Sequence, residues 1–236
     1  LASAGPPSVI GHRPPVLAPI AGALLVLVLI AFVAVRVRVQ VTNVASAIVP
    51  EPRLTLRTFV ELFSETLLKL MGGVMGAKNA RRFFPLIAGC ALFILFSNLM
   101  GLVPGFPAPT SNYNTSLACA FIVVFATHFG GVREQGLAYF KHFLGPILKW
   151  YALPLMILMV VIETISHISR LVSLSVRLTL NMFADHLVVA SFFSLIPLGI
   201  PLPFMVLGLL VCIVQTLVFS LLAVVYISMA LGHESH

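Results

Sequence analysis

Apolar residues dominate this sequence in long runs, separated by short polar or proline-rich segments. Five runs stand out: 16–35, 83–103, 117–132, 152–196 and 203–231. Because about 20 apolar residues span the hydrocarbon core of a bilayer, most of these runs suffice for a crossing, and the last two are long enough to lie tilted. The pattern predicts an all-α, polytopic membrane protein with five transmembrane crossings, two of them long tilted helices.

Residues 53–76 follow a different, amphipathic pattern. Leucine and phenylalanine recur at helical spacing on one face, while Arg57, Glu61, Glu65 and Lys69 step by four along another. This pattern predicts an amphipathic helix on the inner membrane surface, with packing on a soluble partner as the alternative. We expect residues 1–15 to be a flexible leader and 16–236 to form a single membrane domain.

The composition supports a membrane protein and limits the kinds of partner that it is expected to bind. Hydrophobic residues make up 60% of the chain and charged residues only 9%, against about 25% charged in soluble domains. The net charge is +7, but the basic residues lie between apolar runs and form no stripe with aromatic residues. The bilayer is therefore an expected partner and nucleic acid is not. Cys90, Cys119 and Cys212 lie far apart, so their spacing predicts neither disulfides nor a metal site, and no cofactor is expected.

Basic residues are distributed unevenly between the runs. Segment 36–82 holds eight lysines and arginines and segment 133–149 holds three, whereas 104–116 and 197–203 hold none. By the positive-inside rule, the amino terminus is predicted outside and the carboxyl terminus inside. No internal repeat is recognisable by eye, which weighs against transporter folds made of duplicated halves.

The fourth apolar run carries ionisable side chains, which within a membrane usually face a protein interior or a water path. With Arg177 as the reference, at about 100° per residue, one stripe within about 40° collects five other polar residues: Glu163, Ser166, Arg170, Ser173 and Asn181. Asp185 falls at the edge of this stripe and His186 on the opposite side. The stripe predicts an ion path in which a permanently charged arginine is one element.

Structural explanations remain for several of these side chains. Arg170 could extend to the inner interface, Glu163 could be an interface carboxylate neutralised by neighbours, and Arg177 could pair with a carboxylate of the helix bundle. Alternatives for two others are a core histidine bonded to backbone (His186) and a simple interhelical hydrogen bond (Gln215). The sequence contains no recognisable phosphate-binding loop, zinc motif or nucleophile with a base, so the catalytic chemistry typical of soluble enzymes is not expected.

A family resemblance rests on three stretches. "RLVSLSVRLTLNMFADHLVV" and the terminal "PLGIPLPFMVLGLLVCIVQTLVFSLLAVVYISMALGHESH" closely resemble the a subunit of F-type ATP synthases, and "NLMGLVPGFPAPTSNYNTSLACA" resembles its outer-loop region. The resemblance implies a stator subunit with two offset proton half-channels, which couples proton flow to ring rotation and ATP synthesis or hydrolysis without itself making a bond. The alternative is a stand-alone ion channel or secondary transporter that uses Arg177 to bind an anion.

The resemblance also implies partners and a location. The partners are the ring of c subunits, b-type peripheral-stalk subunits and, indirectly, the F1 ATPase sector. The location is an energy-transducing membrane, in the first place a bacterial plasma membrane, with an organelle inner membrane or a thylakoid membrane as the alternatives, and the ion carried is the proton.

Residue roles follow from the same match. Arg177 takes the place of the essential arginine of the "SxRLxxN" motif, which keeps the facing ring carboxylate ionised and blocks leakage between the half-channels. Arginine suits this role because it stays charged in any protein environment. Asn181 and Gln215 match polar residues near that arginine. Glu163 matches a carboxylate of the inner path, and "DH" at 185–186 matches the outer half-channel.

One position departs from many family members. They carry His or Glu seven residues before the glutamine, where this chain has Gly208, and they carry Gly where this chain has Asp185. The chloroplast and cyanobacterial branch resembles this chain in pairing Asp with Gly, but shows Glu in place of His186. We expect Asp185 to fill the space beside Gly208, so that the two long helices touch there. Either Asp185 or His186 then serves as the main proton carrier.

Overall fold

The structure is a computed structural model that describes residues 17–41, 55–103, 108–136, 153–195 and 201–231. The described residues form five long α-helices and one short 3-10 helix, in the order α1 (Leu17–Val41), α3 (Leu56–Gly101), η1 (Pro109–Ser111), α4 (Tyr113–Gln135), α6 (Leu153–Leu195) and α7 (Pro201–Ala230). The predicted leader, 1–15, lies outside the described residues.

All five long helices are long and apolar enough to cross a membrane, which confirms the predicted fold class. The predicted runs and the observed helices agree closely for α6 and α7, whereas α1 extends to Val41, beyond the predicted end at 35, and α4 begins before its predicted run. This helix begins at Tyr113, before the predicted run, because the Asn112 side chain accepts a hydrogen bond from the Asn114 backbone N–H at 3.0 Å. Such a cap satisfies a donor that the first helical turn would otherwise leave unpaired.

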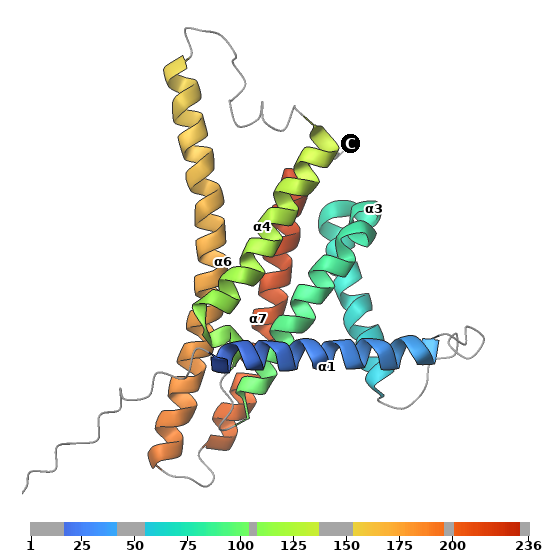
Figure 1. Cartoon of the computed structure of the whole chain (residues 1–236), viewed down its shortest axis with the longest axis vertical. Coiled ribbons are helices and arrows are strands. Elements are labelled where there is room, and N and C mark those ends of the chain that lie inside the picture. Colours follow the sequence, from blue (N-terminus) through green and yellow to red (C-terminus); the bar gives the residue numbers. More distant parts are fainter. Residues whose placement is uncertain (1–16, 42–54, 104–107, 137–152, 196–200, 232–236) are drawn as a thin grey trace, which may run out of the picture.

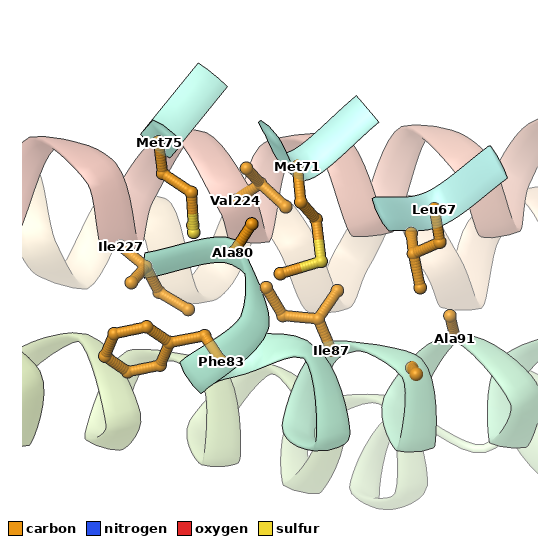
Figure 2. Close-up of a cluster of buried hydrophobic side chains, with 10 residues drawn as sticks. Leu67, Met71, Met75, Ala80, Phe83, Ile87, Ala91, Val224 and Ile227 are labelled. Atoms are coloured by element: carbon orange, nitrogen blue, oxygen red, sulfur yellow. The ribbon is translucent and has the colours of Figure 1, made fainter. Parts of the chain in front are cut away.

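The predicted amphipathic segment and the predicted second crossing are joined in one kinked element, α3. The kink lies at Gly76, whose φ of 77° is a left-handed value. At this point the chain turns back on itself, so the two halves of α3 run side by side (Figure 1). Leu67, Met71 and Met75 point from the first half towards the second half and α7 (Figure 2).

The first half of α3 therefore uses one apolar stripe for packing within the chain. Of its other apolar residues, Leu56, Phe59 and Leu62 are exposed. Its charged residues pair along the helix, Arg57 with Glu61 and Glu65 with Lys69, each at 2.7 Å. Docking of the exposed residues on the membrane surface stays a prediction.

We expect Gly76→Ala to destabilise the protein and Gly73→Ala to stabilise it slightly. Alanine at a left-handed φ costs about 1–2 kcal/mol, whereas at Gly73, a helical position with nothing within 4 Å of an added Cβ, alanine gains about 0.5–1 kcal/mol. The apparent melting temperature of the detergent-solubilised protein should fall in the first variant and hold or rise in the second. Equal shifts would mean that the kink does not depend on the glycine.

The helices differ greatly in length and direction. α6 has 43 residues and is about 65 Å long, roughly twice the hydrocarbon thickness. α1 has 25 residues, about 37 Å, which fits one crossing. Figure 1 shows α1 running crosswise to α6. If α1 crosses the bilayer along the membrane normal, α6 must therefore be strongly tilted in the same bilayer. The length of α6 requires such a tilt as well.

Packing against the other helices fixes which face of α6 is free. Leu174, Leu178 and Met182, spaced by four, are buried against residues of α3, α4, α7 and the segment just before η1. In an 18-residue apolar stretch of α6, only 6% of the residues are buried within the chain. Most of the surface of α6 thus remains free for lipid or for another protein.

Candidate functional site

Arg177 lies beside the buried ridge of α6, and its side chain is exposed. Its neighbour Leu178 is fully buried, so the rotation of the helix leaves the guanidinium at the free surface. In the described part of the chain no carboxylate forms an ion pair with Arg177. The alternative considered from the sequence, a pair within the helix bundle, is not found there. A charge on an apolar helix needs a partner, and the geometry leaves this one open to a neighbouring protein.

One helical turn from Arg177, α6 and α7 are joined by a hydrogen bond. The Asn181 amide nitrogen Nδ2 donates to Oε1 of Gln215 at 2.7 Å. Gln215 is buried, with 4% exposure, whereas Asn181 is exposed. The interhelical bond considered from the sequence is thus present, and it holds a polar amide beside the arginine.

Asp185 lies against Gly208 of α7, as expected from the sequence. A Cβ added at Gly208 would lie 2.8 Å from Oδ2 of Asp185 and 2.7 Å from a methyl group of Leu102. Both distances are shorter than van der Waals contact, so only glycine fits here without a shift. The helices touch at this point, and the carboxylate occupies the space that a side chain at 208 would take.

His186 points to a different neighbour from Asp185. A Cβ added at Gly101, the last residue of α3, would lie 2.8 Å from Nε2 of His186 and 2.6 Å from Cβ of Ala108. The imidazole therefore lies against the end of α3 and the segment before η1, while the carboxylate faces α7. Both side chains are half-buried. Asp185 and His186, which are adjacent in sequence, therefore place a carboxylate and an imidazole at the same end of the molecule.

A buried polar cluster adjoins this end and was missed from the sequence. Thr110 donates from Oγ1 to Oδ1 of Asn98 at 2.6 Å, and Ser116 donates from Oγ to the Thr110 carbonyl at 2.7 Å. All three residues are buried. They hold η1 and the start of α4 against α3, one turn from the glycine that His186 contacts. From the sequence this region was recognisable only as a polar loop, and the hydrogen bonds between these residues were not predicted.

Near the opposite end of the molecule, α6 presents a second group of polar side chains. His167 lies 3.3 Å from Glu163, measured from Nε2 to Oε1. The His167 ring is 4.6 Å from the ring of His128 on α4, centroid to centroid. The Arg170 guanidinium lies 5.2 Å from the centre of the Tyr226 ring on α7, a cation–π arrangement.

Glu163 and Arg170 were predicted from the sequence as members of the polar stripe, whereas His167 and His128 were not predicted as site residues. The i,i+4 spacing of Glu163 and His167 was the available signal. Of the other stripe residues, Ser166 is half-buried and Ser173 is exposed. Within the described ranges no group of three or more His, Cys, Asp or Glu side chains is arranged to hold a metal ion.

These features define a class: a helical membrane protein with ionisable side chains near both ends of one long helix and an unpaired arginine between them. The family model described as "ATP synthase A chain" matches residues 20–228. The chain belongs to this family.

Similar proteins agree with this assignment. The chain is 44% identical over 218 residues, 92% of this chain and 84% of the relative, to "ATP synthase subunit a" of Sorangium cellulosum. It is 50% identical over 181 residues, 77% of this chain and 74% of the relative, to "ATP synthase subunit a 1" of Syntrophotalea carbinolica. It is 47% identical over 181 residues, 77% and 76% respectively, to "ATP synthase subunit a" of Trichlorobacter lovleyi.

Proposed function

We propose that this chain is the stator subunit a of an F-type ATP synthase and that it takes part in proton translocation. It provides two offset half-channels and a fixed positive charge between them, and so couples proton flow to rotation of a ring of c subunits. The observation that carries the proposal is the exposed side chain of Arg177 on α6, with no carboxylate paired to it in the described part of the chain.

Arg177 acts as an electrostatic barrier. A guanidinium close to a carboxylate favours the ionised form of the carboxylate, so a ring carboxylate that reaches Arg177 gives up its proton. A proton cannot pass the arginine directly, because the guanidinium neither loses its own proton nor accepts another. Protons must then enter and leave the ring on opposite sides of this residue.

The two half-channels end on opposite sides of Arg177 along α6. Asp185 and His186 serve the outer half-channel, with Asn181 and Gln215 between them and the arginine. Glu163 serves the inner one, while Ser166 and Ser173 support the polar stripe. Arg170, stacked on Tyr226, serves mainly to hold the inner end of α6.

The pairing of Asp185 with Gly208 resembles the chloroplast and cyanobacterial branch of the family. The close approach of the carboxylate to the glycine backbone supports this likeness. It makes Asp185 the preferred proton carrier of the outer half-channel, with His186 as its neighbour in the relay.

The proposal includes partners and a location. The chain binds the c ring through the free surface of α6 and contacts b-type stalk subunits, while the F1 sector is coupled to it indirectly. It makes no covalent bond itself and needs no cofactor. It lies in an energy-transducing, bacterial plasma membrane with its amino terminus outside and its carboxyl terminus inside.

The proposal is tested by purification and reconstitution. A tagged chain expressed with its co-encoded ATP synthase subunits should copurify with a c ring and a soluble ATPase. Liposomes containing this complex should take up protons when ATP is added, and an uncoupler should abolish the uptake. Isolation of the chain alone as an active transporter would contradict the proposal.

A further inference from the structure

Three ionisable side chains from two helices meet at one place that the arginine barrier does not use. Glu163 and His167 come from α6, and His128 comes from α4. The His167 side chain is only 15% exposed, while that of Glu163 is 33% exposed. The carboxylate thus lies nearer the surface of α6, and the imidazole next to it leads inward towards α4.

An imidazole pair is well suited to passing protons. Histidine changes charge close to neutral pH, and each ring has one nitrogen that can accept a proton while the other donates one. The two rings are tilted by 54° with centroids 4.6 Å apart, so they are direct neighbours. A structural role alone, such as filling space between α4 and α6, would need neither a second imidazole nor a carboxylate beside the first.

The charges around the pair favour occupation by one proton at a time. Arg170, held against Tyr226 of α7, acts electrostatically on both imidazoles, and His128 acts electrostatically on His167. Like charges oppose each other, whereas Glu163 on the far side attracts a charged His167. Further along α4, Glu134 is already paired with Arg82 of α3, and Arg133 is exposed at the helix end.

We infer that the inner half of the proton path leaves the α6 stripe at Glu163 and runs sideways through His167 to His128. The inference rests on the proposed function. During synthesis the protonated Glu163 gives its proton to His167, leaving a carboxylate and an imidazolium. His167 passes a proton to His128 and becomes neutral, and His128 releases it to water at the end of α4. In hydrolysis the same steps run in reverse, so the relay needs no other reactant.

His167→Gln and His128→Gln test the relay because glutamine can form hydrogen bonds but cannot titrate. Passive proton conduction should be measured in vesicles that carry the assembled complex after removal of the soluble sector. We expect each variant to conduct about 100-fold more slowly than the parent at neutral pH, the lower end of the effect of losing a proton-transfer group. Thr164→Val is the matched control, because Thr164 is exposed, adjoins Glu163 and bonds only its own helix at 2.7 Å; it should conduct like the parent.

Two further readouts separate a relay from a packing role. Imidazole added on the inner side should restore conduction in His128→Ala, because it replaces the missing proton carrier, but it should not restore Arg177→Ala. The slope of conduction against pH should flatten in the glutamine variants, since a titratable imidazole has been replaced by a side chain that does not titrate.

The outcomes of these experiments are distinct. A parent that fails to conduct protons would overturn the proposed function itself. A conducting parent whose glutamine variants keep its rate and pH profile would overturn the relay alone. The relay is equally overturned if the variants are slow but keep the parental pH profile and gain nothing from imidazole, since the histidines would then act only in packing.

Discussion

Vesicles carrying Arg177→Ala are expected to show no measurable ATP-driven proton uptake. In the proposed mechanism the Arg177 guanidinium is the fixed charge that keeps a passing ring carboxylate ionised. Removing a preorganised charge of this kind typically lowers a rate by about 100-fold to 1,000-fold. Fluorescence quenching of a pH-sensitive dye in inverted vesicles measures the uptake directly.

A matched arginine substitution separates this effect from a general loss of charge. Arg82 is already paired with Glu134 between α3 and α4, so Arg82→Ala should assemble and retain most of the parental uptake. Arg177→Lys should also fail, because a lysine beside a carboxylate can transfer its proton and is not a permanent barrier. ATP-driven proton uptake at the parental rate in Arg177→Ala would contradict the role proposed for the arginine.

Asp185→Gly is expected to slow proton uptake by about 100-fold or more, as loss of a proton-transfer group does. The double variant Asp185→Gly with Gly208→Asp should recover uptake to within about threefold of the parent. The reason is geometric: Oδ2 of Asp185 lies 2.8 Å from the position of a Cβ at 208, so the exchange returns a carboxylate to nearly the same place from the opposite helix. Initial rates of dye quenching measure the recovery.

The single variant Gly208→Asp completes the comparison. It places a second carboxylate, and a Cβ 2.7 Å from Leu102, against Asp185. Crowding and like charge should both lower the rate. If the double variant is no faster than either single variant, the carboxylate does not act from the shared space between α6 and α7.

Much of the fold was predictable because membrane helices depend on length and hydrophobicity. The run 152–196 and α6, Leu153–Leu195, agree almost to the residue. The contact of Asp185 with Gly208 was also predicted, but from the family resemblance, because many members carry an ionisable residue at the position of Gly208 and glycine at that of Asp185. The stripe around Arg177 followed from helical periodicity alone.

Other features depend on tertiary structure and could not be read from the pattern. The predicted amphipathic segment 53–76 ends at the residue where the chain turns, Gly76, but its pattern does not predict that the chain turns back on itself there. The apolar stripe of the first half of α3 predicts burial without saying that its own second half and α7 cover it. The His128–His167 contact joins residues on separate helices, so no local spacing in the sequence predicts it.

Site-directed cross-linking tests the central claim, that the Arg177 face of α6 lies against the c ring. Cys90, Cys119 and Cys212 are first replaced by alanine or serine, and a cysteine is placed beside the carboxylate of the c subunit. Leu180→Cys, exposed within a turn of Arg177, should then cross-link to the ring in the assembled complex. Phe125→Cys on α4 is similarly exposed within the chain, at 62% against 57% for Leu180, and should not. Equal cross-linking from both positions, or none from Leu180→Cys in a complex that still pumps protons, would contradict the account.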